Sequence, residues 1–409
     1  MSYEIRTIVT KLRQLHRKIG TLKLAVYIVR RLLGRQAVGL SRVDVLGFYA
    51  FTRRQPFGQA LPAGLPKKTV NWVIPDFAIG SGGHVNIFRF VAGLEEMGFE
   101  CRIVIVGPSH CQSGAQARAA ICEHFNPVRA DVVLGEEGMQ PAFFTIATSW
   151  QTAYYVRNFN GTSRKCYFVQ DFEPFFFAHG SEYLLAEQTY RFGFTGITAG
   201  DWLAAKLAAD YGMQTRAIGF SYDRHLYAPQ PRKAGGVRQV FFYARPPTPR
   251  RAFELGIMVL DAIAKKLPDV HFILAGWDTS GYALPFPHRN AGSVALADLP
   301  ALYRECDAAL VLSLTNLSLL PLELMACGCP VVSNRGPNVE WLLTPEVAVL
   351  ADPTVEALSE AVVALLDDEG RRQALIEAGL ALAGRTDWAH EAEKFARTLE
   401  DMIEEKTPA

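Results

Sequence analysis

The stretch SLLPLELMACGCPVVSN, residues 318–334, contains one carboxylate, Glu323, inside an apolar run that precedes a short predicted strand. Pro321 suits the first position of a helix, and an acid in the first turn complements the positive end of the helix dipole. A second interpretation is that the end of this helix faces a ligand and that the carboxylate accepts hydrogen bonds from a diol. The local sequence allows both interpretations.

A glycine-rich turn, PDFAIGSGGHVNIF at residues 75–88, connects a predicted strand to a predicted helix. Gly80, Gly82 and Gly83 allow a ligand to approach the backbone, and the N–H groups at the start of the helix favour an anion. The turn is not a dinucleotide-binding fingerprint, because G-x-G-x-x-G requires a glycine where Val85 stands. A tight turn with only a structural role has the same signature.

Two arginines occur in YARPPTPRRAFELG, residues 243–256. Arg245 directly follows a predicted strand, and Arg250 precedes a helix that is expected to begin near Ala252. Guanidinium groups held at a strand end and a helix start can clamp a diphosphate. The alternative is a proline-rich loop with arginines in solvent. Phosphate binding is favoured for Arg245, which its strand holds in place, but not for Arg251.

Two acids follow a predicted strand in YFVQDFEPFFFAHG, residues 167–180. Asp171 and Glu173 stand among aromatic residues, and paired acids beside aromatic surfaces suit sugar recognition. The alternative is a loop whose aromatic side chains pack into the core.

The composition restricts the classes of protein. A chain of 409 residues predicts two domains of roughly 150–200 residues. A hydrophobic fraction of 49% with 20% charged residues indicates a folded chain. The net charge of +1 gives no field that would attract nucleic acid, so no nucleic-acid partner is expected. The seven cysteines contain no C-x-x-C pair, which favours a reducing, cytoplasmic location.

Residues 11–36 carry eight Lys and Arg residues and no acid around an apolar run. A basic amphipathic helix of this kind can lie on an anionic membrane face, which would make the protein peripheral on the inner face of the cytoplasmic membrane. The alternative is a helical extension that packs on its own domain or on a second subunit. No apolar stretch approaches the ~20 residues of a membrane span.

Two series of apolar strands alternate with helical patterns. The helix that follows the glycine-rich turn has Val85, Phe88, Val91 and Leu94 on one face. This alternation predicts two doubly wound α/β domains with ligands at the carboxyl ends of their strands, in a cleft between the domains. The strands are expected within 69–74, 101–107, 143–150, 164–172, 238–245, 270–277, 308–314, 330–334 and 347–352, and helices within 252–266, 298–305 and 354–367.

The motif LLPLELMACGCPVVSN resembles the donor-site signature of GT-B glycosyltransferases of family 4. The resemblance extends to GSGGHVN, to ARPPTPR and to GFSYDRHLYAP, and it covers roughly residues 69–385. VQDFEPFF and YARPPTPRRAFELG are most similar to bacterial rhamnosyltransferases that build surface glycans, including those of S-layer assembly. The implied fold is GT-B, with two Rossmann-like domains.

The expected organisation has four parts. An N-terminal, partly helical extension precedes an acceptor domain and a nucleotide-sugar donor domain, and the last helix can cross back to the acceptor domain. Their ranges are 1–66, 67–228, 229–385 and 386–409.

The resemblance implies roles for several residues. Glu323 would bind the ribose hydroxyls of a nucleotide-sugar donor, and Arg245 with Arg250 would match an Arg-x4-Lys pair that binds the diphosphate. Further donor-binding residues are expected at Gly82, Gly83, Thr315, Leu319 and Leu320, and His84, near the diphosphate and the transferred sugar, is a candidate catalytic residue together with Arg245 and Arg250.

One position departs from the family pattern. The family has an acid eight positions before Glu323, where this chain has Thr315. The acid contacts hydroxyls of the donor sugar, and a 6-deoxy sugar such as rhamnose can dispense with it. The same change would also fit a weak or inactive enzyme.

The expected reaction transfers a sugar, with rhamnose from dTDP-rhamnose as the leading candidate, to a growing glycan or lipid-linked glycan. No D-x-D pair appears, so no metal and no cofactor are expected. The resemblance implies retention, in which the leaving phosphate can accept the acceptor proton. An inverting reaction needs a carboxylate base, for which Asp171 and Glu173 are the candidates. Two alternatives are a catalytically silent glycan-binding scaffold and a nucleotide-sugar epimerase.

Overall fold

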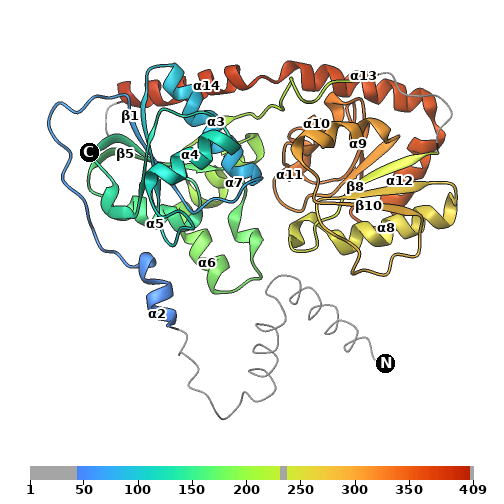
Figure 1. Ribbon diagram of the computed structural model, residues 1–409, viewed down its shortest axis with the longest axis horizontal. Coiled ribbons are helices and arrows are strands. Elements are labelled where there is room, and N and C mark those ends of the chain that lie inside the picture. The colour runs from blue at the N-terminus through green and yellow to red at the C-terminus, as the bar shows by residue number, and fades with distance from the viewer. Residues whose placement is uncertain (1–43, 231–236, 406–409) are drawn as a thin grey trace, which may run out of the picture. The chain divides into compact units, whose positions relative to one another are not determined.

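The computed structural model describes residues 44–230 and 237–405 (Figure 1). The chain divides into a small unit, described at residues 44–50 and 280–283, and a larger unit that contains both β-sheets. The small unit contains the short helix α2 (Val45–Phe48). The basic stretch 11–36 lies outside the described residues, as does most of the predicted linker at 229–236.

The first sheet has seven parallel strands in the order β3-β2-β1-β4-β5-β6-β7. The order reverses between β1 and β4, which gives a topological switch point at the carboxyl end of β1. The strands are β1 (Thr69–Ile74), β2 (Glu100–Ile105), β3 (Asp131–Leu134), β4 (Ala142–Ala147), β5 (Thr162–Val169), β6 (Thr195–Ala199) and β7 (Thr215–Ile218).

The second sheet has six parallel strands in the order β10-β9-β8-β11-β12-β13. Its order reverses between β8 and β11, so the carboxyl end of β8 is the second switch point. The strands are β8 (Gln239–Tyr243), β9 (His271–Ala275), β10 (His288–Gly292), β11 (Ala308–Val311), β12 (Val331–Asn334) and β13 (Val349–Ala351).

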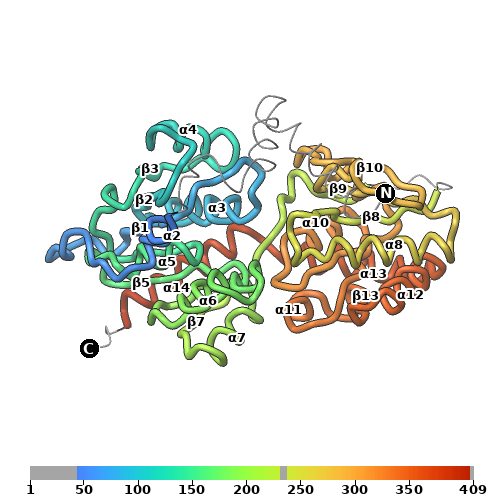
Figure 2. Tube along the Cα trace, turned by 90° about the horizontal axis from the view of Figure 1, so that it is seen from below, coloured from blue at the N-terminus to red at the C-terminus, as the bar shows by residue number. Residues whose placement is uncertain are grey.

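Helices pack on both sheets. The helices that accompany the first sheet are α3 (Gly82–Glu96), α4 (Gly114–His124), α5 (Trp150–Asn158), α6 (Ser181–Gln188), α7 (Asp201–Tyr211) and α14 (Trp388–Glu404). Those of the second are α8 (Phe253–Lys266), α9 (Leu299–Glu305), α10 (Leu320–Ala326), α11 (Pro337–Glu340), α12 (Val355–Asp367) and α13 (Glu369–Arg385). Helix α12 lies beside β13 and α13 lies beside α12 (Figure 2). Single 3-10 turns are η1 (Ala50–Thr52), η2 (Glu136–Gly138), η3 (Glu173–Phe176), η4 (Thr189–Arg191), η5 (Pro249–Arg251) and η6 (Leu296–Asp298).

The last helix, α14, belongs to the core of the first sheet although its sequence follows the second. It runs beside α3 (Figure 1). The two backbones approach so closely that a Cβ on Gly93 would lie 2.6 Å from the Cβ of Ala392. The buried ring of Phe395 packs against Trp72, Phe90 and Phe168. The chain therefore returns to its first sheet after completing the second.

The predicted α/β class and the parallel strands are confirmed, because every predicted strand region overlaps one of the observed strands. Several predicted regions extend too far. The region 143–150 was expected to be a strand throughout, but β4 ends at Ala147 and Ser149 caps α5, where its hydroxyl accepts from the N–H of Thr152. The structure adds β3, β6, β7 and β10, which are short or exposed and have no continuous apolar run.

Candidate functional site

The glycine-rich turn follows β1 and opens α3 at the first switch point. Gly80 has φ +83, and a Cβ on Gly82 would meet nothing within 4 Å, so the turn is open on this side. Ser81 is the N-cap residue but makes no side-chain cap bond to the described backbone. No side-chain cap therefore satisfies the first N–H groups of α3, which lie at the positive end of a 15-residue helix and suit an anion.

His84, in the first turn of α3, is held by its neighbours. The hydroxyl of Ser81 lies 2.9 Å from its Nδ1. Burial lowers the pKa of the imidazole, which favours the neutral ring. Its Nε2 is buried, and a contact with the backbone of Pro75 raises the pKa against the effect of burial. A neutral imidazole at this position can donate or accept one hydrogen bond.

Gln170, which follows β5, connects the glycine-rich turn to the neighbouring loop. Its Nε2 donates to the carbonyl oxygen of Gly83 at 3.0 Å, and its Oε1 accepts from Nδ2 of Asn86 at 3.0 Å. The first turn of α3 is therefore fixed by a side chain that follows β5, which is separated from β1 by β4 in the sheet. Sequence reasoning did not single out Gln170.

The arginines follow β8, at the second switch point, and their surroundings differ. Arg245 is exposed, and its Nη1 lies 3.4 Å from the hydroxyl of Tyr243. Arg251 is engaged within the fold, where its Nη1 donates to Oγ of Ser313 at 2.7 Å. Arg250 lies between these extremes, with 27% of its side chain exposed.

Asp171 is buried and joins the segment after β5 to the loop after β11. Its Oδ2 accepts from the hydroxyl of Thr315 at 2.8 Å, and its Oδ1 accepts from the backbone N–H of Asn316 at 2.8 Å. The Nε of Arg250 lies 3.5 Å from Oδ2. Burial raises the pKa of Asp171, against the opposing charges of Arg251 and Arg250 and the hydrogen bonds.

Glu173 is also buried, in a separate environment. The hydroxyl of Tyr167 donates to its Oε1 at 2.6 Å, and the backbone N–H of Trp150 donates to Oε2 at 2.9 Å. Burial raises the pKa of the carboxyl to about 7. The expectation that Asp171 or Glu173 faces an acceptor as a base is not supported by this geometry, because their carboxylates are enclosed and already hydrogen-bonded within the protein.

Glu323 lies in the first turn of α10. The hydroxyl of Tyr303 is 3.5 Å from its Oε2. Burial raises the pKa of the carboxyl to about 7, against the opposing charge of Arg89 on α3. The nearby residues expected to bind the donor are less accessible: Leu320 is 8% exposed, and Leu319 packs against the core of the first sheet. Thr315 is fully buried and faces Asp171.

Arg89 is a site residue that sequence reasoning missed. It forms an ion pair with Asp223 at 3.6 Å and stacks on Trp388 of α14 at 4.8 Å. Its charge also acts on Glu323, so a side chain of α3 belongs to the surroundings of the α10 carboxylate. The available signal was the pair Asn86 and Arg89, which are polar and three residues apart on an otherwise apolar helical face.

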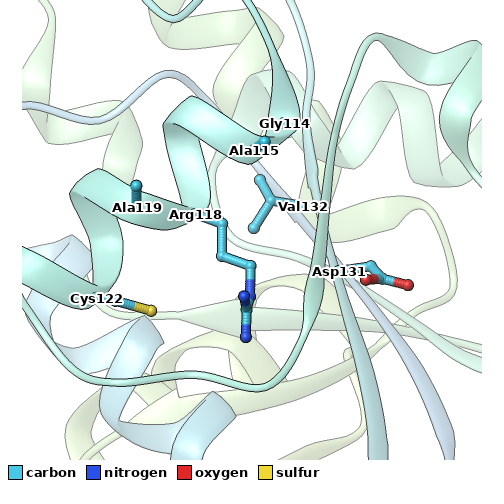
Figure 3. A pocket seen from close by; sticks show the side chains of 7 residues that line it. All are labelled: Gly114, Ala115, Arg118, Ala119, Cys122, Asp131 and Val132. Carbon is cyan, nitrogen blue, oxygen red and sulfur yellow. The ribbon is translucent and has the colours of Figure 1, made fainter.

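A separate depression lies beside the edge strand of the first sheet (Figure 3). It is lined by residues of α4 and β3, among them Arg118, Cys122 and Asp131. None of the site residues predicted from the sequence lines it. Within the described residues, no group of three or more His, Cys, Asp or Glu side chains is arranged to hold a metal ion, and no helix is long and apolar enough to cross a membrane.

Two protein-family models match the chain in order. The N-terminal domain of WsaF matches residues 85–199, and the C-terminal domain of WsaF matches residues 238–363. The first match contains α3 from Val85 onward and Asp171, and the second contains Arg245, Arg250 and Glu323. The chain belongs to the GT-B glycosyltransferases. Gly82, Gly83 and His84 of the candidate site precede the first matched region.

One curated protein is similar to most of this chain. The O-antigen biosynthesis protein RfbC of Myxococcus xanthus is 35% identical over 366 residues, which are 86% of this chain and 28% of that protein. The chain therefore spans little more than a quarter of the length of this curated relative.

Solved structures share the fold. The complex of Anabaena Alr3699/HepE with UDP and glucose has a TM-score of 0.61 at 17% identity, and the match covers 81% of this chain and 99% of that one. Sucrose-phosphate synthase from Thermosynechococcus elongatus has a TM-score of 0.61 at 13% identity, with coverage of 82% and 99%. At these identities the similarity establishes the GT-B fold alone.

Proposed function

We propose that the protein transfers a sugar from a nucleotide sugar to a growing bacterial surface glycan, free or lipid-linked, and that the donor is dTDP-rhamnose. The observation that carries the proposal is the pairing of the two switch points. The open N-terminus of α3 follows β1, and Arg245 and Arg250 follow β8, so groups that favour a diphosphate occur at both. The RfbC relative, named for O-antigen biosynthesis, supports the surface-glycan class of acceptor.

The chemistry requires charge stabilisation on the leaving diphosphate while an oxocarbenium-like centre develops at the anomeric carbon. This stabilisation would come, without a metal ion, from the guanidinium groups of Arg245 and Arg250 and from the N–H groups at Gly82 and Gly83. The carboxylate of Glu323 would accept hydrogen bonds from the ribose diol of the donor. A complex of Anabaena HepE with UDP and glucose supports a nucleotide-sugar ligand for this fold.

The reaction is proposed to retain the configuration at the anomeric carbon. The acceptor hydroxyl attacks this carbon as its bond to the diphosphate oxygen breaks, and the leaving phosphate takes the acceptor proton. Retention needs no protein base, which agrees with the enclosed positions of Asp171 and Glu173. Rhamnose is proposed because Thr315 replaces the family acid and donates to Asp171, so the donor pocket lacks one acceptor for sugar hydroxyls.

A thermal-shift panel tests the donor. Wild type and Glu323→Gln are heated with dTDP, UDP, GDP or ADP, and with dTDP-rhamnose. A ligand at 100 times its dissociation constant stabilises by roughly 2.7 kcal/mol, which moves the melting temperature visibly. Wild type is expected to respond to dTDP, and Glu323→Gln is expected to lose that response. The exposed acid Glu356, in the first turn of α12, provides the matched control Glu356→Gln, which should respond as wild type does.

Transfer is then measured with dTDP-rhamnose and a rhamnose-terminated acceptor, and NMR of the product gives the anomeric configuration. A scaffold would bind no nucleotide at millimolar concentration and transfer no sugar. An epimerase would convert the donor without an acceptor. Transfer with inversion would contradict the retaining mechanism but leave the sugar-transfer proposal standing.

A further inference from the structure

Arg250 is held by two side chains that belong to the first sheet. Its Nε lies 3.5 Å from Oδ2 of Asp171, which follows β5. Its guanidinium carbon lies 4.1 Å from the ring centroid of Phe176, in the turn η3. Arg250 itself follows β8 of the second sheet. A carboxylate thus contacts one edge of the guanidinium, and an aromatic ring covers one of its faces.

These contacts leave the hydrogen-bonding capacity of Arg250 unused. A guanidinium has five N–H donors, and the buried Nε of Arg250 has no hydrogen-bond partner among the described residues although it lies 3.5 Å from Oδ2 of Asp171. The arginines that serve the fold differ in this respect. Arg251 donates to Ser313, and Arg238 donates to Asp269 and Asp367. The guanidinium of Arg250 is therefore held in one orientation while it keeps N–H donors available to bind an anion.

We propose that Asp171 and Phe176 are positioning residues that aim the Nη edge of Arg250 at the donor diphosphate. The inference rests on the proposed function, which gives Arg250 to that diphosphate. It adds that residues of the first sheet determine how well the second-sheet arginine distinguishes a diphosphate from a monophosphate. Neither Asp171 nor Phe176 needs to touch the donor.

Asp171 is rigid enough for this task. Thr315 and the backbone of Asn316 donate to its two oxygens, and only 12% of its side chain is exposed. Thr315 donates to Oδ2, the same oxygen that faces Arg250. An acid at position 315, as the family pattern has it, would repel this carboxylate at close range. Threonine at 315 and aspartate at 171 are therefore complementary, and together they fix the carboxylate beside Arg250.

The test measures the affinities for dTDP and dTMP by calorimetry. The two ligands differ only in the second phosphate, so the ratio of their affinities reports what that phosphate contributes to binding. Phe176→Leu removes the ring face but keeps an apolar side chain, and Asp171→Asn removes the charge but keeps the shape. Each is expected to lower the dTDP-to-dTMP affinity ratio by about 3- to 10-fold, and Arg250→Gln by more. The matched control is Phe175→Leu, since Phe175 shares η3 but packs against Phe172 and Lys206. It should leave the ratio unchanged.

A double-mutant cycle separates positioning from a general loss of structure. In the Arg250→Gln background, Phe176→Leu is expected to change the ratio no further, because the group that it orients is gone. An unchanged ratio in both Phe176→Leu and Asp171→Asn, or additive losses with Arg250→Gln, would overturn the inference. If Asp171→Asn fails to fold, the Phe176 cycle alone decides.

Inorganic pyrophosphate distinguishes this inference from the proposed function. Suppose that wild type transfers no sugar, but that pyrophosphate raises its melting temperature and this shift depends on Arg250, Phe176 and Asp171. The positioning inference then stands, and the transferase proposal is wrong. If wild type transfers sugar, but the variants keep the dTDP-to-dTMP affinity ratio of wild type, the transferase proposal stands and the positioning inference is wrong. If neither dTDP nor pyrophosphate binds wild type, both are wrong.

Discussion

The backbone N–H of Asn316 donates to Oδ1 of Asp171 at 2.8 Å, so the loop after β11 of the second sheet is hydrogen-bonded to the segment after β5 of the first. The side chain of Asn316 extends this contact. Its Nδ2 donates to the carbonyl oxygens of Gln170 and Ala199, and its Oδ1 accepts from the indole of Trp341 at 2.9 Å. One buried amide therefore satisfies groups that follow β5, end β6 and cap α11.

The first prediction concerns the stability that this amide provides. Asn316→Ala leaves two carbonyl oxygens and one indole N–H without partners in a buried environment, and it is expected to lower the free energy of unfolding by roughly 3 kcal/mol. Urea unfolding measures the change. The control is Asn160→Ala at an exposed position, which should stay within about 0.5 kcal/mol of wild type. A loss at Asn316 no larger than at Asn160 would contradict the prediction.

The parts of the fold that the sequence predicts are those with local signatures. Strands such as β1 and β8 are apolar at successive positions because both of their faces are buried, and this makes them visible as runs. Strand β10, with the sequence HRNAG, lies exposed at the sheet edge and has no such run. Its position follows from pairing with β9, which no local pattern encodes.

The same distinction applies to the site. The glycine-rich turn and Arg245 were predictable because each directly follows a strand whose pattern is clear. The contact of Asp171 with Thr315 joins residues 144 positions apart, and only the folded chain brings them together. The sequence suggested Asp171 for sugar recognition or, in an inverting reaction, as a base, whereas in the structure it accepts hydrogen bonds from Thr315 and Asn316. Arg89 was missed for the same reason, since its partners Asp223 and Trp388 are distant in sequence.

The second prediction concerns Gly200, the residue before α7. It has φ +85, and a Cβ there would lie 2.6 Å from the ring of Trp341. Gly200→Ala is expected to cost about 3 kcal/mol of unfolding free energy, from backbone strain and overpacking together. Gly212, at the other end of α7, has φ +66 and open space around its Cβ position. Gly212→Ala should cost only about 1 kcal/mol, and equal losses would show that contact with Trp341 has no part in the effect.

The third prediction is that nucleotide affinity depends on pH through Glu323. Its carboxyl has a pKa of about 7, so its ionised fraction, which can accept both ribose hydroxyls, increases as pH rises through neutrality. The affinity of wild type for dTDP, divided by that of Glu323→Gln, is expected to rise several-fold between about pH 6 and about pH 8. Titration of the nucleotide itself affects both proteins and cancels in this ratio. A ratio that stays constant would remove Glu323 from the binding site.

The fourth prediction uses Glu173, whose pKa is raised by burial from 4.5 to about 7. Between these values the folded protein keeps a proton that the unfolded chain releases, so the stability contributed by this group is lost as pH rises. The stability of wild type relative to Glu173→Gln should therefore fall by about 3 kcal/mol between pH 4.5 and pH 7. Unfolding by urea at a series of pH values measures this difference.

A control of opposite sign is available at Glu346, where the hydrogen bond from Thr344 lowers the pKa of an exposed carboxyl. The stability of wild type relative to Glu346→Gln should rise with pH through the acidic range, because the unfolded chain holds the proton longer there. If the stability difference between wild type and variant falls with pH for Glu173→Gln and rises for Glu346→Gln, each change comes from the substituted carboxyl. A general effect of pH on the fold would give both differences the same sign. If the stability difference between wild type and Glu173→Gln does not change with pH, the carboxyl is already ionised in the folded protein. The hydrogen bonds from Tyr167 and from the N–H of Trp150 would then stabilise the carboxylate.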